Sequence, residues 1–263
     1  MRRISKVLVL LLAMSLITGC LVSCKKEDAN VFTVGFDAEF PPYGYKDDNG
    51  EYVGFDLSLA EEVCKRNGWT LKKQPIDWNS KDMELKSGTI DCIWNGFTIN
   101  GREKDYTWSQ AYIDNKQVVV VKEDSGINSL ADLKGKTVET QKDSSALAAL
   151  KGDNKTIGDS FAKLVEVADY NTGIMDLKSG ACDAVALDIG VAQYQVTNGN
   201  NTGLKILNDS ISSEQYGIGF KLGNTALKDQ VQKTLDEMYA DGTVSKIAEN
   251  YSSYGVPGSL IKR

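Results

Sequence analysis

The residues of this chain that could do chemistry follow two similar segments. These segments are MELKSGTIDC, residues 83–92, and MDLKSGACDA, residues 175–184. WNGFTINGRE, residues 94–103, comes after the first copy and carries the guanidinium of Arg102. VALDIG follows the second copy and carries the carboxylate of Asp188 at the end of an apolar run. The segment after the first copy thus supplies a cation, Arg102, and the segment after the second supplies an anion, Asp188.

Together these two groups suit a small ligand that carries a carboxylate and an ammonium on one carbon. The planar guanidinium of Arg102 matches the two oxygens of a carboxylate. Asp188 would hold the ammonium, with help from backbone carbonyls and a hydroxyl. Burying either ligand charge without a partner would cost on the order of several kcal/mol. If Arg102 and Asp188 come from opposite lobes, the ligand bridges the cleft and binding favours the closed form.

The composition excludes several other kinds of site. The chain has no histidine, which excludes Ser-His-Asp and Cys-His nucleophilic sites and the usual imidazole zinc sites. Its formal net charge of −6 argues against nucleic acid as a partner, because phosphate binding needs clustered Lys and Arg. The absence of histidine does not exclude carboxylate or lysine chemistry. We expect no catalytic residue, no cofactor and no metal.

Three cysteines lie beyond the N-terminal region: Cys64, Cys92 and Cys182. No pair of them has the spacing of a metal or redox site. We expect all three to be small buried hydrophobes. A disulfide between Cys92 and Cys182 is the alternative for an exported protein.

Each copy of the repeated segment reads as a short helix, a glycine stop and a strand. Gly88 and Gly180 are the stops, and 91–94 and 184–187 are the strands. Helices and strands alternate along the rest of the chain as well. Further strands are expected at 31–36, 70–75, 117–121, 136–140, 163–169 and 215–220, and helices at 57–66 with Asp56 as its N-cap, 129–133, 144–150, 188–196 and along a C-terminal stretch through Leu227 and Met238.

This alternation predicts an α/β protein built from two similar units with mainly parallel sheets. Ligands of open α/β sheets bind beyond the carboxyl ends of the strands, so the residues after each copy should face a shared cleft. We expect one lobe from 31–117 plus 215–263 and a second from 118–214. Two crossover segments, near 117–121 and 215–220, would join them.

The N-terminus has the pattern of an export signal. A basic start is followed by an apolar stretch, 7–17, that is too short to span a bilayer. ITGC and LVSC then resemble the lipobox of bacterial lipoproteins, and the pattern fits lipidation of either Cys20 or Cys24. We expect a signal peptide and lipobox over 1–23, a linker over 24–30, and a lipid anchor on the outer face of the cytoplasmic membrane or a periplasmic location. Plain secretion is the alternative.

The segment GFDLSLAEEVCKRN, residues 54–67, and the order of the later motifs resemble a known family. This is the bacterial solute-binding protein family 3, whose members bind polar amino acids for ABC importers. The resemblance runs from about Val31 to the C-terminus, and it departs at Ser58, where an acidic residue is usual. It implies a two-lobed, type II periplasmic-binding-protein-like fold that closes like a Venus flytrap, and delivery of an amino acid to permease subunits.

The resemblance also implies roles for particular residues. Arg102 would clamp the ligand's α-carboxylate, and Asp188 would hold its α-ammonium. Gly96 would offer its carbonyl to the ammonium, and Thr98 its hydroxyl and amide. The remaining expected contacts are Asp37, Phe40 and Trp78 around the ligand side chain, and Ser144 and Ser145 in the QKDSS loop, whose amides would meet the carboxylate from the second lobe.

Two departures from the family pattern bear on the site. The stretch from Thr98 to Arg102 is one residue shorter than in many members. Asp143 stands where the QKDSS loop usually has a glycine, and an anion there is unfavourable beside a carboxylate unless it points away. Two rival functions stay open: an enzyme on the same fold, such as a cyclohexadienyl-type dehydratase, and a module that presents its ligand to a receptor.

Overall fold

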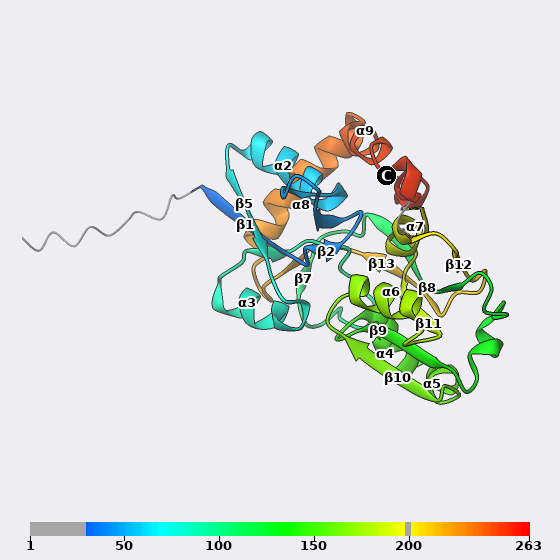
Figure 1. The fold of residues 1–263 in the computed structure, drawn as a ribbon. Coiled ribbons are helices and arrows are strands. Elements are labelled where there is room, and N and C mark those ends of the chain that lie inside the picture. Colours follow the sequence, from blue (N-terminus) through cyan, green and yellow to red (C-terminus); the bar gives the residue numbers. More distant parts are fainter. Residues whose placement is uncertain (1–29, 198–200) are drawn as a thin grey trace, which may run out of the picture. The chain divides into compact units, whose positions relative to one another are not determined.

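Two separate β-sheets organise the chain, and each is flanked by helices (Figure 1). The first sheet has the order β5 (Thr70–Pro75), β1 (Val31–Phe36), β6 (Cys92–Ile93), β14 (Gly219–Phe220) and β7 (Thr107–Trp108). The second has the order β10 (Lys163–Val167), β9 (Thr137–Gln141), β11 (Ala184–Asp188), β8 (Ile113–Lys122) and β12 (Leu204–Ile206), with β13 (Ser212–Tyr216) also paired to β8. A small sheet joins β2 (Glu39–Phe40), β3 (Gly44–Lys46) and β4 (Tyr52–Val53). We call the parts around the first and second sheets the first and second lobes.

This computed structural model describes residues 30–197 and 201–263. Within it, Phe32–Arg263 form one compact unit. The predicted leader, with Cys20 and Cys24, lies outside the described residues. Among the described residues, no helix combines the length and the apolar character that crossing a membrane requires.

Each of the two large sheets contains parallel strand pairs. β1 pairs in parallel with β6, and β9 pairs in parallel with both β10 and β11. The connecting strands are antiparallel: β8 pairs with β11, β12 and β13, and β14 pairs with β6 and β7. The predicted α/β fold with two sheet regions and two crossovers is thus confirmed.

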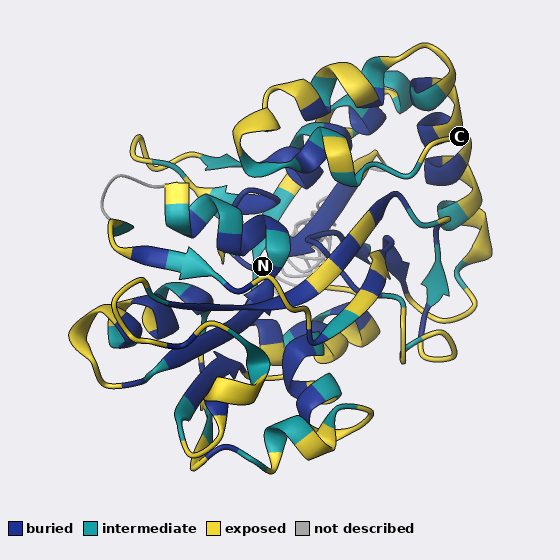
Figure 2. Ribbon diagram, turned by 90° about the vertical axis from the view of Figure 1, so that its right-hand side faces the viewer, coloured by how far each residue is buried: buried dark blue, intermediate teal, exposed yellow. Residues whose placement is uncertain are grey.

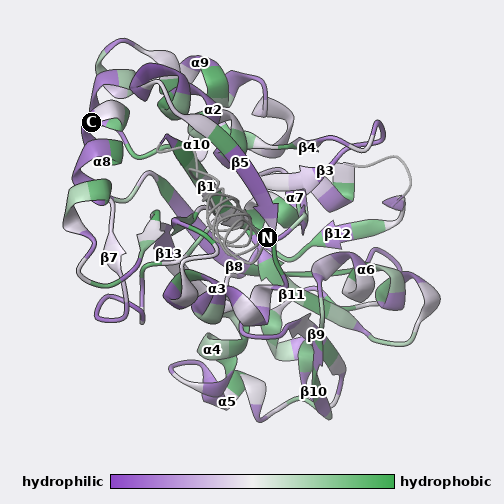
Figure 3. Cartoon of the chain, turned by 90° about the vertical axis from the view of Figure 1, so that its left-hand side faces the viewer, coloured by the Kyte–Doolittle hydropathy of each residue, from purple (hydrophilic) through white to green (hydrophobic). Residues whose placement is uncertain are grey.

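The helices cover the sheets, with their outer faces exposed and their inner faces buried (Figure 2). Helices such as α8 carry both hydrophilic and hydrophobic residues, as one buried face requires (Figure 3). The helices are α2 (Phe55–Asn67), α3 (Lys81–Ser87), α4 (Ser145–Lys151), α5 (Lys155–Gly158), α6 (Tyr170–Ser179), α7 (Ile189–Thr197), α8 (Thr225–Ala240), α9 (Thr243–Glu249) and α10 (Val256–Ser259), with 3-10 turns at Trp78–Ser80, Leu130–Leu133 and Ser252–Tyr254.

The repeated segment forms the same unit in both lobes. Its first copy makes α3 and β6, and its second makes α6 and β11. Gly88 and Gly180 end the helices in the left-handed conformation, with φ of 82° and 86°. Each helix therefore stops where the sequence predicts, and each feeds a strand toward the same kind of sheet edge.

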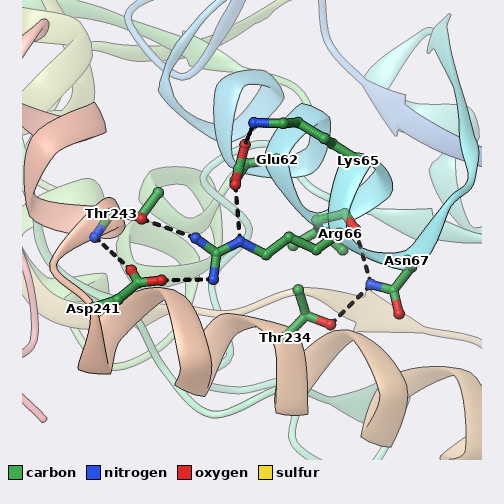
Figure 4. Close-up of polar contacts among 8 residues, drawn as sticks. Glu62, Lys65, Arg66, Asn67, Thr234, Asp241 and Thr243 are labelled. Carbon is green, nitrogen blue, oxygen red and sulfur yellow. Dashed lines mark hydrogen bonds and ion pairs between the residues drawn. The ribbon is translucent and has the colours of Figure 1, made fainter.

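A polar network joins the end of α2 to the C-terminal helices (Figure 4). The Arg66 guanidinium donates to Glu62 at 2.8 Å and to Thr243 at 2.9 Å, and it forms an ion pair with Asp241 at 2.8 Å. Asn67 donates to Thr234 of α8 at 2.8 Å. α2 and α8 lie side by side (Figure 1), so the C-terminal segment packs onto the N-terminal one.

Two local predictions are wrong. Gly54, not Asp56, is the N-cap of α2, and Asp56 lies in the first turn with its carboxylate buried. The expected strand 215–220 is divided into β13 and β14 because the chain passes there from the second sheet to the first. The three cysteines are buried and free, so the disulfide alternative is not formed.

Candidate functional site

One small cavity brings together most of the residues that the sequence suggests. Its volume is about 20 Å³, roughly the space of one water molecule. Two of the three charged residues predicted to contact the ligand, Arg102 and Asp188, line it. The full lining is Phe40, Trp78, Gly96, Thr98, Arg102, Gln141, Ser144, Ser145, Tyr170 and Asp188.

Both lobes contribute to this cavity at the ends of their strands. The segment after β6 supplies Gly96, Thr98 and Arg102 from the first lobe. Gln141 ends β9 and Asp188 ends β11, so both come from carboxyl ends of strands in the second sheet. The cavity therefore has the position that open α/β sheets give to their ligands.

The Arg102 side chain reaches from the first lobe to the second. Its Nη1 donates to the Thr98 carbonyl at 3.3 Å and to Ser145 Oγ at 3.0 Å, and its Nη2 donates to the Asp143 carbonyl at 3.3 Å. The guanidinium carbon also lies 5.3 Å from the centre of the Phe97 ring. These contacts hold a planar cation at the cavity wall, where it can bind a carboxylate.

Asp188 is the acidic residue of the cavity lining, and several hydrogen bonds hold its carboxylate. Its Oδ1 accepts hydrogen bonds from Asn115 Nδ2 at 2.7 Å, Gln117 Nε2 at 2.7 Å and Tyr216 Oη at 2.6 Å. Tyr170 Oη donates to its Oδ2 at 3.4 Å. Burial raises the pKa of Asp188 to about 7, and the nearby Glu214 carboxylate adds to that rise. An ammonium at this position would supply the cation that Asp188 needs.

Glu214 of β13 is a second buried acid directly behind Asp188. Its Oε1 accepts from Thr98 Oγ1, Asn115 Nδ2 and Gln117 Nε2, each at 2.8 Å. The two amides thus bridge the Asp188 and Glu214 carboxylates. The Thr98 hydroxyl, which the sequence assigns to the ligand, donates to Glu214 instead in this arrangement.

Gly96 has the backbone conformation that the cavity wall requires. Its φ is 56°, and a Cβ there would lie 2.6 Å from Cε1 of Phe40. Its amide donates to Asp56 Oδ2 at 2.6 Å, and Tyr112 Oη donates to the same oxygen at 2.8 Å. Burial raises the pKa of Asp56 to about 7. Asp56 thus fixes the orientation of a peptide unit of the cavity wall.

Asp37 is the one predicted contact residue that does not line the cavity. Its Oδ2 accepts from Gln141 Nε2 at 2.6 Å, so Gln141 stands between it and the cavity. Burial raises the pKa of Asp37 to about 6. Among the described residues, no group of three or more His, Cys, Asp or Glu could hold a metal ion.

Comparison with known proteins identifies the family. A profile described as "Bacterial extracellular solute-binding proteins, family 3" matches residues 32–254. The chain belongs to this family. The L-cystine-binding protein TcyA of Bacillus subtilis (strain 168) is 32% identical over 87% of this chain and 83% of its own length.

Solved structures agree with this assignment. A substrate-binding protein of an ABC uptake transporter from Streptococcus pneumoniae, with bound histidine, has a TM-score of 0.81 and 31% identity over 84% of this chain and 92% of its own. An ancestral arginine-binding protein bound to arginine has a TM-score of 0.78 and 39% identity over 84% and 98%. Family 3 members are extracytoplasmic proteins, and these relatives are binding proteins rather than enzymes.

In this solute-binding protein, Asp143 takes over the conformation of the usual loop glycine. Its φ of 58° lies in the left-handed region. Its carboxylate forms an ion pair with Lys81 of α3 and does not contact Arg102, which meets only the Asp143 carbonyl. The anion thus points away from the expected carboxylate position.

Several polar residues of the site were not predicted as contacts: Lys81, Asn115, Gln117, Gln141, Tyr170, Glu214 and Tyr216. Two of them lie in the segment IDNKQ at the start of β8. Asn115 and Gln117 occupy every second position there and face the buried side, and the residues between them are exposed. Amides at buried strand positions indicate a polar partner inside.

Proposed function

We propose that this protein binds a zwitterionic, polar amino acid between its lobes and delivers it to the permease of an ABC importer. The observation that carries the proposal is the presence of Arg102 and Asp188 on one cavity, with no shared hydrogen bond between them. Arg102 would bind the α-carboxylate and Asp188 the α-ammonium. A cavity of about 20 Å³ cannot admit an amino acid, so the lobes have to separate before the ligand enters and close around it afterwards.

The other predicted contact residues support this assignment by position. Phe40 and Trp78 line the cavity together with Tyr170 and would contact the ligand's side chain, and Ser145 contacts Arg102. We propose that Gly96, Thr98 and Ser144 complete the polar end of the site. Asp37 would act on the ligand only through Gln141.

Relatives indicate the class of ligand. TcyA is named for L-cystine, the Streptococcus pneumoniae protein holds histidine, and the ancestral protein holds arginine. All three ligands share the α-amino and α-carboxyl groups and differ in the side chain. We propose binding without turnover, because the named relatives are binding proteins.

The two lobes would move as the predicted segments 31–117 plus 215–263 and 118–214. Sheet membership supports this division apart from its boundaries. β8 begins at Ile113 and β13 ends at Tyr216, and both pair in the second sheet, whereas β14 pairs in the first. β8 and β13 also pair with each other, with Gln117 opposite Ser212 and Ile113 opposite Tyr216. The two connecting strands therefore run side by side where the lobes meet.

Calorimetric titration of the purified protein with L-cystine, L-histidine and L-arginine tests the function. We expect at least one to bind, and Arg102→Ala and Asp188→Ala each to weaken binding by about 2–5 kcal/mol, because each leaves a ligand charge buried without a partner. Lys104→Ala, an exposed cation in the same loop as Arg102, is the matched control and should bind normally. Unchanged affinity in both site variants would disprove the site.

We also propose that the protein is exported and lipid-anchored through Cys20 or Cys24. The support is the lipobox pattern and the extracytoplasmic location of the family. Replacing each cysteine singly by serine, followed by membrane fractionation, should release the protein from membranes in one case only. Release in neither case, nor in the double variant, would contradict the anchor.

A further inference from the structure

The side-chain amides of Asn115 and Gln117 bridge the carboxylates of Asp188 and Glu214. Each amide nitrogen donates to both acids: Asn115 Nδ2 at 2.7 and 2.8 Å, and Gln117 Nε2 at 2.7 and 2.8 Å, to Asp188 Oδ1 and Glu214 Oε1 respectively. All four side chains are buried. Two carboxylate oxygens are thus held close together by two pairs of N–H groups.

This pair of acids has no cationic partner in the described part of the chain. No ion pair between residues of 30–197 and 201–263 involves Asp188 or Glu214. The other titratable groups that face the pair are the phenols of Tyr43, Tyr170 and Tyr216. Burial raises the pKa of each phenol well above its usual value of 10, so all three stay neutral. Arg102 lies on the same cavity, but its guanidinium bonds Thr98, Asp143 and Ser145.

We infer that Glu214 is the second acid of the ammonium site: with Asp188 it forms an anionic pair that the α-ammonium of the ligand completes. The inference rests on the proposed function. Glu214 is a positioning residue, since it acts on the ligand through Asp188 and Thr98. Its charge strengthens the attraction for an ammonium and, without a ligand, favours a proton on Asp188.

The same arrangement connects the ligand to both connecting strands. Asn115 and Gln117 belong to β8, Glu214 belongs to β13, and Asp188 ends β11. An ammonium bound at Asp188 is therefore linked by hydrogen bonds to both strands through which the chain passes between the lobes. Ligand binding can thus be coupled to lobe closure through Glu214.

The test compares wild type with Glu214→Gln, a variant of the same shape that keeps an oxygen for Thr98 and the two amides. Affinities for L-arginine, L-glutamine and L-cystine are measured by calorimetry from about pH 5 to about pH 8. Because the pKa of Asp188 is about 7, wild-type affinity should fall by up to about tenfold per pH unit below that value. In Glu214→Gln the affinity should be about tenfold weaker near pH 8, and its decline should begin at lower pH.

A second readout needs no ligand. Melting temperatures of both proteins are compared over the same pH range. Removing the Glu214 charge should favour Glu214→Gln over wild type more at about pH 8 than at about pH 5, since the repulsion from Asp188 exists only when Asp188 is ionised. Asp37, whose pKa is about 6, titrates in both proteins, so only the difference between them is used.

Asp114→Asn is the matched control, because it removes an exposed carboxylate from the same strand, β8. It should follow the wild-type curves. A difference between Glu214→Gln and wild type that does not change with pH would overturn the inference while leaving amino acid binding intact. Failure of wild type to bind any amino acid would instead overturn the proposed function, and the ammonium role with it. The melting curves would then test only whether the Asp188 and Glu214 carboxylates repel each other.

Discussion

At the residue scale, Gly96 is a position of the cavity wall where one added methyl group should have a large local effect. Its φ of 56° is unfavourable for a residue with a Cβ, and that Cβ would lie 2.6 Å from Phe40. We expect Gly96→Ala to lose about 1–2 kcal/mol of stability from the backbone and about 1–3 kcal/mol more from overpacking. Urea denaturation measures the stability, and titration with amino acids should show weaker binding because Phe40 is displaced.

The control for this prediction is Gly88→Ala. Gly88 also has positive φ, at 82°, but a Cβ there would meet nothing within 4 Å. This variant should lose only the backbone contribution and should bind amino acids as wild type does. Equal stability losses in the two variants would contradict the overpacking at Gly96.

Single residues of the site were predictable where residue type and position in the sequence already indicate their chemistry. A lone arginine and a lone aspartate, each after a repeated segment, point to opposite charges in one cleft, and the structure places Arg102 and Asp188 on one cavity. Residues whose role depends on contacts between distant segments were not predictable. Gln141, which covers Asp37, and Glu214, which lies behind Asp188, have contacts that only the folded chain creates.

At the element scale, the ion pair between Lys81 and Asp143 joins α3 of the first lobe to the loop before α4 of the second. The Lys81 side chain is only 2% exposed, whereas that of Asp143 is 51% exposed. We expect Asp143→Asn to weaken amino acid binding by roughly 5- to 100-fold, because closure would then bury Lys81 without a partner. The loss is smaller than for a fully buried ion pair, because Asp143 is half exposed. Calorimetry measures the affinity, and small-angle scattering measures closure.

A second substitution, at Lys81, should restore part of the lost affinity. Lys81→Met combined with Asp143→Asn removes both charges and should bind more tightly than Asp143→Asn alone. Asp105→Asn, an exposed acid on the same surface groove, is the control and should leave affinity unchanged. If the double variant binds no better than Asp143→Asn, the ion pair does not contribute to closure.

Elements whose pattern is local were predicted well, and those that depend on distant partners were not. The helix, glycine and strand of each repeat follow from helix stop signals and apolar runs alone. Asp56 was misassigned as a cap because its actual partner, the amide of Gly96, lies 40 residues away. The run 215–220 looks like one strand, yet the sheets on its two sides are different, and nothing local marks the change.

At the scale of the whole molecule, several buried carboxyl groups share one property. Burial raises the pKa values of Asp56 and Asp188 to about 7 and that of Asp37 to about 6, above the usual value of about 3.9 in an unfolded chain. Between about pH 4 and about pH 7 the folded protein therefore binds more protons than the unfolded chain. Its stability must then fall as the pH rises through this range.

Groups with lowered pKa values work in the opposite direction but at lower pH. Hydrogen bonds from Thr243 lower the pKa of Asp241 to about 2, and the Arg66 guanidinium adds to this effect. The stability that Asp241 contributes is present above the unfolded value and is lost as the pH falls toward 2. Because this group is exposed, its contribution is small. The two sets together place the maximum of stability near pH 4, about the unfolded pKa of a carboxyl group.

We therefore expect the ligand-free protein to have a larger free energy of unfolding at about pH 5 than at about pH 8, by on the order of 1 kcal/mol or more for each buried carboxyl. Urea denaturation across this range measures it. Asp56→Asn removes one of the three groups while its amide oxygen can still accept from Gly96 and Tyr112, so its profile should be flatter. A stability that rises from pH 5 to pH 8 would show that these carboxyl groups are ionised at little cost. In that case Asp188 would not need a ligand's ammonium to offset its charge.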